Sequence, residues 1–311
     1  MKETCVSVVM PTFNGAKYIK EAVQSILEQT HQNFELIIID DGSTDNTKEI
    51  IESFNDKRIK YTYQNNKGPA AAYNAGFKRA ASEFIFIMDH DDYSYPNRIE
   101  RQLEYMQDNG LNICGSWYEI EHVRNRYIEN VKRNYPPEKL NEVLMFLPWA
   151  IATPTICLRK EVFIQYGYFN EKFKAAFDYE FVSRLIFNER IGIVPSILFR
   201  WRNHKKSYSS LTARDGRAVF KKIAETKIRL HSSNIPQENY FMYLGLLNYY
   251  SDDLIKSLKY LLTSLFLQYD KNIFKYILTI IFGGIAIKII RKYELFSLPV
   301  IRSVKKALIS F

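Results

Sequence analysis

Three carboxylates lie within four residues at Asp89-His90-Asp91-Asp92, directly after the apolar run Phe84–Met88. Carboxylates this close repel one another unless a cation or firm hydrogen bonds compensate their charge. An oxygen-rich site of this kind suits Mg²⁺ or Mn²⁺, which keeps some waters and takes further ligands from phosphate oxygens. The segment therefore indicates a metal and phosphate site, with a solvated acidic turn before a helix as the alternative.

A second polar segment, Asp40-Asp41-Gly42-Ser43-Thr44-Asp45, follows the apolar run Phe34–Ile39. A carboxylate at the end of a strand can accept the imide N–H of a uracil or bind ribose hydroxyls, but the same residues could simply cap the next helix. The chain contains neither Gly-x-Gly-x-x-Gly nor Gly-Lys-Ser/Thr. Metal and side chains must therefore meet any phosphates, because the glycine-rich phosphate loops are missing.

Short apolar runs alternate with helical patterns through the first hundred residues. The patterns predict strands at 5–10, 34–39, 58–63 and 84–88, and helices at 16–29, 44–54, 69–81 and 96–107. Such alternation predicts an α/β fold whose mostly parallel sheet has helices on both faces. Ligands of these sheets bind outside the carboxyl ends of the strands. Polar residues follow three of those ends, at Pro11-Thr12-Phe13-Asn14, Asp40-Asp41 and Asp89–Asp92, and predict a binding site on one rim.

Farther along, residues 111–200 are less regular, with strands expected at 112–118 and 155–158 and a helix at 179–187. From about Phe220 the pattern is wholly helical, so we predict a domain at 1–218 and a helical C-terminal region at 219–311. Nearly all of the net charge of +9 lies in that C-terminal region. A near-neutral body argues against a nucleic-acid partner. The basic region suits peripheral contact with anionic phospholipid, or a basic helical tail in solution.

Localisation follows from the apolar segments and the cysteines. The segment Ile273–Ile290 is strongly apolar, but its charge-free part is only 12 residues long, whereas a spanning helix needs roughly 20. We expect an interfacial helix or one packed on the domain. Near the N-terminus, the run Cys5–Met10 is too short for the core of a signal peptide, and three widely spaced cysteines suit a reducing compartment. We expect a cytoplasmic protein, with the inner face of the plasma membrane as a site of peripheral contact.

Four motifs, in their order and spacing, resemble the family 2 glycosyltransferases with the Rossmann-like GT-A fold. They are Pro11-Thr12-Phe13-Asn14, Asp40–Asp45, Asn74-x-Gly76 and Asp89-x-Asp91-Asp92. The resemblance is dense over residues 5–110 and extends thinly to about 210. It implies a nucleotide-diphospho-sugar donor, usually a UDP-sugar, and an inverting single displacement by a hexosyl- or N-acetylhexosaminyltransferase. With the basic tail, it suggests a glycan or lipid-linked glycan acceptor in cell-surface polysaccharide synthesis.

The same resemblance implies roles for individual residues. Thr12 and Asp41 would contact the uridine, and Asp89 would lie near the ribose or the sugar. In the metal site, Asp91 would be a ligand, and His204 would complete the metal or diphosphate site. Arg202 would contact phosphate, with a basic surface loop at Arg200–His204 as the alternative. The donor-binding set is Pro11, Thr12, Phe13, Asn14, Asp41, Asn74 and Asp89.

Asp178, in Phe177-Asp178-Tyr179-Glu180, matches the family's catalytic aspartate. As general base it would take the acceptor's proton while the acceptor oxygen attacks the anomeric carbon. Relatives carry Glu where this chain has Phe177, which leaves Glu180 as a competitor, and a helix N-cap is the alternative for Asp178. A second departure is Tyr73, where many relatives carry Arg; Lys67 or Arg79 would have to substitute.

Two other functions share these residues. A catalytically inactive nucleotide-binding scaffold of a membrane glycan-assembly complex would bind the donor without transferring sugar, and the two departures motivate it. A metal-dependent phosphohydrolase would use the same aspartates to release phosphate without an acceptor. The intact acidic cluster and Asp178 favour the transferase.

Overall fold

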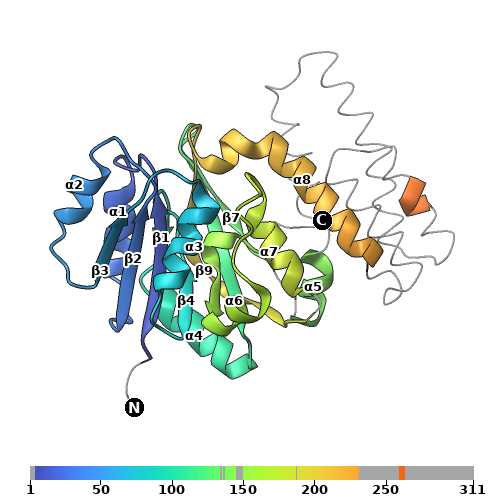
Figure 1. Cartoon of the computed structure of the whole chain (residues 1–311). Coiled ribbons are helices and arrows are strands. Elements are labelled where there is room, and N and C mark those ends of the chain that lie inside the picture. The colour runs from blue at the N-terminus through green and yellow to red at the C-terminus, as the bar shows by residue number, and fades with distance from the viewer. Residues whose placement is uncertain are drawn as a thin grey trace. The chain divides into compact units, whose positions relative to one another are not determined.

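One sheet of nine strands organises the part of the chain that our computed structural model describes, which is residues 4–133, 135, 137–144, 150–186, 188–230 and 259–262 (Figure 1). The strand order is β3-β2-β1-β4-β8-β6-β9-β5, and β7 pairs with β6. The strands are β1 Val6–Thr12, β2 Phe34–Asp40, β3 Ile59–Tyr63, β4 Phe84–Ile87, β5 Tyr93–Ser94, β6 Ile113–His122, β7 Tyr127–Val131, β8 Cys157–Arg159 and β9 Ile191–Asn203.

The half of the sheet built from β1, β2, β3 and β4 is wholly parallel. Strand β1 pairs with β2 and β4, and β2 pairs with β3. Every residue of β1 and β2 is buried, as expected for Val- and Ile-rich strands covered on both faces. The predicted alternation of strands and helices is confirmed here, and so is the predicted α/β fold with a parallel sheet.

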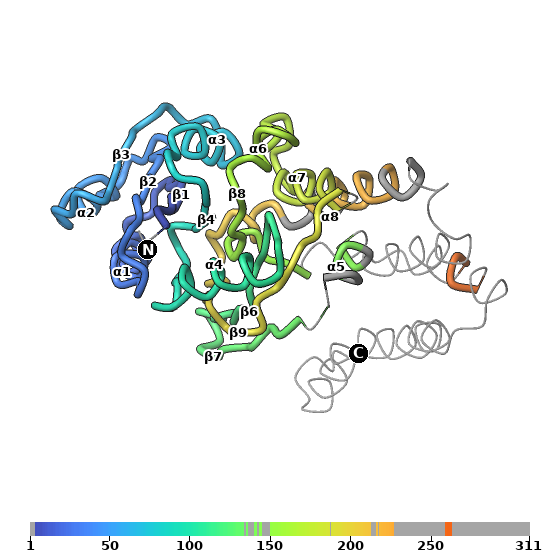
Figure 2. The backbone as a smooth tube through the Cα atoms, turned by 90° about the horizontal axis from the view of Figure 1, so that it is seen from below, coloured from blue at the N-terminus to red at the C-terminus, as the bar shows by residue number. Residues whose placement is uncertain are grey.

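Helices cover both faces of this half. They and the remaining helices are α1 Ile19–Leu27, α2 Thr47–Glu52, α3 Pro69–Arg79, α4 Arg98–Asn109, α5 Pro137–Leu144, the short η2 Thr153–Thr155, α6 Lys160–Tyr166, α7 Phe177–Leu185 and α8 Tyr208–Leu230. Figure 2 shows α3 on one side of β1 and β2 and α1 on the other. Close packing of α3 needs Gly76, because a Cβ there would lie 2.3 Å from Val9 Cγ1.

The other half of the sheet is mixed. Strand β8 runs antiparallel between β4 and β6, whereas β9 runs parallel to β6 and its end pairs antiparallel with β5. We predicted β6 and β8 but not β5, β7 or β9. The expectation of a basic surface loop at 200–204 is wrong for Arg200–Asn203, because these residues form the end of β9 and pair with Glu119–His122 of β6.

The C-terminal part begins within α8. The chain divides into two compact units, Met1–Ile223 and Ala224–Phe311, and the boundary predicted after residue 218 lies inside α8. The apolar segment 273–290 lies outside the described residues. Among the residues that the structure describes, no helix combines the length and the apolar character that crossing a membrane requires. The site described below lies within the first unit.

Candidate active site

The acidic cluster occupies the turn between β4 and β5. Asp89, Asp91 and Asp92 each offer a carboxylate oxygen, and these three atoms lie within 4.8 Å of one another. Asp92 is fully buried, and its Oδ2 has no hydrogen-bond partner among the described residues. A buried carboxylate oxygen without a partner is costly unless a cation or a proton compensates it. The donor set and the unpartnered oxygen therefore fit a hard divalent cation.

Burial and mutual repulsion shift the protonation of the cluster. Burial, followed by the neighbouring charge of Asp91, raises the pKa of Asp89 to about 7. The same two causes, with the charge of Asp89 added, raise the pKa of Asp92 well above its usual range. Such shifts concentrate where a site is built to hold a cation or to move protons, which distinguishes this cluster from the solvated acidic turn considered above.

Asp91 and His204 meet as predicted for a metal site. His204 follows the end of β9, and its Nε2 lies 2.9 Å from Asp91 Oδ2. Burial disfavours the ionised Asp91, but the hydrogen bond to His204 and the electrostatic effect of the His90 ring outweigh it and hold the pKa of Asp91 below its usual range. Two residues 113 positions apart in the chain thus share one polar contact. Whether both bind a metal stays a prediction.

Arg202 does not have the role we predicted. Its side chain is 4% exposed and pairs with Glu21 of α1 at 2.6 Å and with Glu121 of β6 at 3.1 Å. Its backbone N–H donates to Asp92 Oδ1 at 2.8 Å, and its guanidinium donates to the Asp91 carbonyl oxygen. The expected contact with phosphate is therefore replaced by a structural one, in which Arg202 holds the acidic turn against β9.

The turns after β1 and β2 form the predicted donor rim. Asn14 has a φ of 51°, its N–H donates to Ser43 Oγ, and its Oδ1 accepts from Thr44 N at 2.9 Å. These bonds tie the two turns together. Phe13 beside them is 46% exposed and offers an open ring face, which suits stacking on a base.

Asp41 and the end of β1 are buried in this rim. Asp41 accepts from Gln64 Nε2 and from the N–H groups of Lys67 and Gly68, all at 2.7 to 2.9 Å. The carboxylate thereby shapes the loop before α3. Pro11 and Thr12 are the last residues of β1, and both are buried. The contacts that we predicted between these residues and a uridine stay predictions.

Asn74 lies buried against the 169–171 segment. It is 3% exposed, and its amide nitrogen donates to the Phe169 carbonyl oxygen and to Glu171 Oε1, both at 2.8 Å. Its Oδ1 accepts from Phe169 N at 3.0 Å. Every polar atom of the side chain is thus engaged within the protein. Asn74 thus joins α3 to the 169–171 segment, and its contact with a donor stays a prediction.

Asp178 reaches the acidic cluster from α7. Its Oδ2 accepts from Thr153 Oγ1 at 2.8 Å, and its charge is one of the causes that raise the pKa of Asp89. The N-cap position of α7 is Ala176, so the N-cap alternative for Asp178 is wrong.

Glu180, the competitor for the role of base, is committed elsewhere. It pairs with Arg184 at 3.2 Å, and Arg184 also donates to the carbonyl oxygens of Tyr166 and Tyr168. This arrangement holds the loop before α7. Of the two acids, Asp178 is therefore the one whose carboxylate lies with the cluster.

Both departures from the family pattern lie in one aromatic cluster. The Tyr73 ring lies 6.5 Å from that of Phe177 and 5.5 Å from that of Phe169, and the Tyr73 hydroxyl donates to Asp89. Tyr73 thus supplies a donor to the acidic cluster from the position where many relatives carry Arg. Arg79, one of the two expected substitutes, instead donates to the Ala75 carbonyl oxygen within its own helix.

Arg98, which sequence reasoning missed, lies buried beside the cluster. It is 1% exposed, and its guanidinium donates to the carbonyl oxygens of Ile87 and Pro154 at 2.9 and 2.8 Å. Burial lowers the pKa of Arg98 to about 10, while the charge of Asp92 acts in the opposite direction. No local signal marks this residue, because a charged residue in a helix is normally solvated.

Comparison with known proteins agrees with this geometry. The family described as "Glycosyl transferase family 2" matches residues 7–167. An uncharacterized glycosyltransferase of Rickettsia typhi is 34% identical over 204 residues, which are 64% of either chain. One from Rickettsia felis is 39% identical over 158 residues, which are 50% of this chain and 26% of that protein. The chain thus spans less than two thirds of the length of these curated relatives.

Solved structures share the fold at low sequence identity. Staphylococcus aureus TarS 1-349 in complex with UDP-GlcNAc has a TM-score of 0.63 at 20% identity, over 86% of this chain and 77% of that chain. Mannosyltransferase PcManGT from Pyrobaculum calidifontis, in complex with GDP-Man and Mn²⁺, has a TM-score of 0.58 at 17% identity, over 94% and 82%. Since the family match covers more than half of the chain and includes all four motifs from which it was predicted, the protein belongs to glycosyltransferase family 2 and has the GT-A fold.

Proposed function

We propose that the protein is an inverting glycosyltransferase that moves a sugar from a nucleotide-diphospho-sugar, with a UDP-sugar as the first candidate, to an acceptor hydroxyl. One observation carries the proposal. The carboxylates of Asp89, Asp91 and Asp92 gather within 4.8 Å of one another, and the ring of Phe177, next to Asp178 on α7, lies 6.5 Å from that of Tyr73, whose hydroxyl donates to Asp89. A carboxylate base beside a metal site that can bind the donor diphosphate is the arrangement that transfer of the sugar by a single displacement requires.

The proposed roles follow from the contacts. Asp91 and His204 hold a divalent ion, Mn²⁺ or Mg²⁺, and the bound ion supplies positive charge that stabilises the departing diphosphate. Asp178 accepts the proton of the acceptor hydroxyl while one C–O bond forms at the anomeric carbon and the bond to the diphosphate breaks. Thr153, which donates to Asp178, and Tyr73, which donates to Asp89, orient the two carboxylates.

The donor class has further support. TarS was solved with UDP-GlcNAc and PcManGT with GDP-Man and Mn²⁺, which favours a nucleotide-sugar and a divalent ion here and leaves a hexosyl and an N-acetylhexosaminyl donor as equal candidates. The exposed Phe13 ring suits the base of such a donor. For the acceptor we propose a glycan or lipid-linked glycan of a polysaccharide pathway, with the basic region 219–311 contacting the anionic inner face of the membrane.

The first experiment is a calorimetric titration of UDP into the full chain, with Mn²⁺ and then with EDTA, on wild type and on Asp91→Ala. We expect binding that requires the ion and is lost in the variant. Retained folding of Asp91→Ala, checked by its melting curve, makes the loss interpretable. Equal affinity for UDP with and without EDTA would overturn the metal-dependent donor site.

A matched pair of variants then tests the base. Asp178→Asn should keep UDP affinity and lose transfer from a UDP-sugar by about 10²- to 10⁴-fold, the usual contribution of a general base. Glu180→Gln on the same helix should keep most of the transfer activity. UDP binding without transfer or donor hydrolysis in wild type would favour the inactive scaffold, and phosphate release from phosphoesters without an acceptor would favour a phosphohydrolase.

A further inference from the structure

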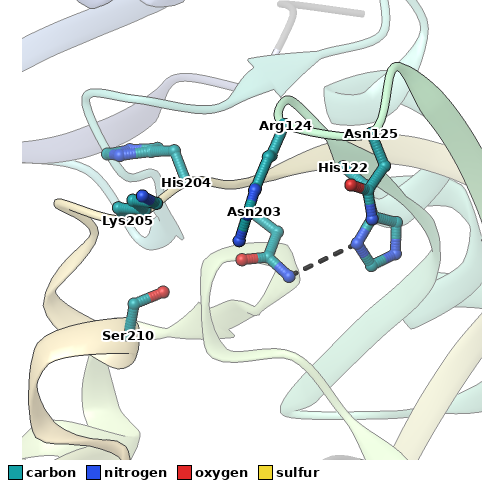
Figure 3. Close-up of a pocket in the computed structure, with 7 residues that line it drawn as sticks. All are labelled: His122, Arg124, Asn125, Asn203, His204, Lys205 and Ser210. Atoms are coloured by element: carbon teal, nitrogen blue, oxygen red, sulfur yellow. Dashed lines mark hydrogen bonds between the residues drawn. The ribbon is translucent and has the colours of Figure 1, made fainter. Parts of the chain in front are cut away.

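A polar pocket of about 520 Å³, lined in part by His204, lies beside the candidate active site (Figure 3). It is formed by the turn between β6 and β7, the end of β9 and the first turn of α8. Arg124 and Lys205 line it together with two histidines, His122 and His204. None of the lining residues is acidic, and the two formal charges among them, on Arg124 and Lys205, are positive. Glu129 lies at the edge, with its Oε2 3.4 Å from His122 Nε2.

Arg124 and Lys205 lack the carboxylate partners that Arg200 and Arg202 have at the end of β9. Arg200 pairs with Glu119 at 2.5 Å, and Arg202 pairs with two glutamates. Within the described residues, neither Arg124 nor Lys205 forms an ion pair or a hydrogen bond, and both are exposed. Two unpaired cations in one hollow favour an anion, because a guanidinium binds phosphate and carboxylate through paired hydrogen bonds.

Asn203 and His122 of the lining are held in place by contacts within the protein. Asn203 Nδ2 lies 3.4 Å from His122 Nδ1, and the His122 ring stacks on Tyr127 at 4.2 Å. Figure 3 shows the other end of the Asn203 amide, its oxygen, turned away from His122. Asn125 and Ser210 also line the pocket. Amides and hydroxyls of this kind bind sugar or polyol hydroxyls, which have matching donors and acceptors.

The position of the pocket suits the acceptor better than the donor. The predicted donor residues lie at the ends of β1, β2 and β4 and, for Asn74, on α3, whereas the pocket is built on the β6–β7 turn, β9 and α8. His204 joins the two, since its ring lines the pocket and binds Asp91. At the start of α8, the Tyr208 ring lies 6.4 Å from that of Phe177, and the charge of Asp178 contributes, after burial, to a raised Tyr208 pKa. The pocket thus shares His204 with the acidic cluster, and the helix that supplies its Ser210 begins beside Phe177, the sequence neighbour of Asp178.

We propose that this pocket binds an anionic group, phosphate or carboxylate, on a polyhydroxylated acceptor. The inference rests on the proposed glycosyl transfer and adds the chemical class of the second substrate. Arg124 and Lys205 bind the anion, and Asn125, Asn203 and Ser210 bind neighbouring hydroxyls. An acceptor anchored there presents a free hydroxyl toward Asp178.

The test uses three probes, glucose 6-phosphate, glucuronate and glucose, titrated into the full chain saturated with UDP and Mg²⁺. We expect the two anionic probes to bind at least tenfold more tightly than glucose. The variant Arg124→Gln/Lys205→Gln should lose that preference, by about tenfold or more for each charge-assisted hydrogen bond removed, and should still bind UDP. Lys206→Gln, an exposed lysine outside the pocket lining, is the matched control and should behave as wild type.

The other outcomes overturn the proposal, reassign the pocket or identify the anchored group. Equal binding of glucose and glucose 6-phosphate, or no binding of either anionic probe, overturns it. So does an unchanged preference in the double variant. A double variant that loses UDP affinity assigns the pocket to the donor diphosphate instead. If wild type fails to bind UDP but still binds glucose 6-phosphate through Arg124 and Lys205, the proposed donor site fails while the anion pocket stands. A difference between the two anionic probes identifies phosphate or carboxylate as the anchored group.

Discussion

Arg98 offers a sharp test of how the acidic turn is held in a buried environment. Its guanidinium donates to the carbonyl oxygens of Ile87, at the end of β4, and of Pro154, and it lies 5.0 Å from the centre of the Phe199 ring. Arg98→Met keeps the apolar stem but removes the charge and these hydrogen bonds. Two buried carbonyl oxygens lose a charged donor, and each such loss costs about 1–3 kcal/mol. We therefore expect a destabilisation of about 2–6 kcal/mol.

The assay is the thermal melting of the full chain without added metal. At about 2–4 °C per kcal/mol for a domain of this size, Arg98→Met should melt well below wild type. Arg101→Met on the same helix is the control: Arg101 is 54% exposed and forms only a surface pair with Glu104, which is worth less than about 1 kcal/mol.

Added Mn²⁺ gives this prediction a second signature. Because Arg98 offsets part of the charge of Asp89 and Asp92, its removal leaves the cluster more dependent on another cation. Mn²⁺ should therefore raise the melting temperature of Arg98→Met more than that of wild type. Melting of Arg98→Met together with Arg101→Met, or an equal response of both to Mn²⁺, would refute the reasoning.

Three further substitutions test the packing and electrostatics of the same domain. Gly76→Ala should lower the melting temperature by an amount corresponding to about 1–3 kcal/mol, because its Cβ would lie 2.3 Å from Val9 Cγ1, although helix propensity alone favours Ala; a stabilised variant would contradict the close packing. Asn74→Asp should destabilise the fold by at least about 1 kcal/mol, because a carboxylate would face the Phe169 carbonyl oxygen; urea unfolding of wild type and variant measures it. Glu35 is 7% exposed; burial disfavours its ionised form, but hydrogen bonds outweigh burial and hold its pKa below the usual range. Ionised Glu35 should thus contribute its full stabilisation above the pKa that it has in the unfolded chain, and this contribution should be lost as the pH falls through the lower pKa of the folded protein. Between pH 7 and about 3, the melting temperature of Glu35→Gln should therefore fall less than that of wild type. An equal fall in both proteins would count against this assignment.

The active site draws its residues from two kinds of segment. The acidic turn and the rim at Asn14 follow buried parallel strands, and their place at the carboxyl ends is a property of the α/β fold. Asp178 and His204 come from the mixed half, and contacts between distant residues bring them to the cluster. This division explains why the acidic turn was easier to predict than the pocket beside His204, which depends on a turn, a strand end and a helix start.

Local pattern was sufficient for the parallel half of the sheet. Strands β1, β2, β3 and β4 were predicted within two residues of their bounds, because runs such as Phe34–Ile39 are apolar throughout and end at turn-forming polar residues. The four motifs likewise identified the family and the acidic cluster. Each of these signals is contained in a stretch of a few neighbouring residues, so no knowledge of the rest of the fold was required.

Tertiary structure decided the rest, because the missing information lay in distant partners. Arg202 could enter a buried strand only because Glu21 and Glu121 neutralise it from two other elements. Asn74 is a structural residue because the 169–171 segment meets both ends of its amide. Burial of Arg98 depends on carbonyl oxygens supplied by β4 and η2. A charged or polar side chain is stable inside a protein only when such partners surround it, and a linear pattern does not say where they will be.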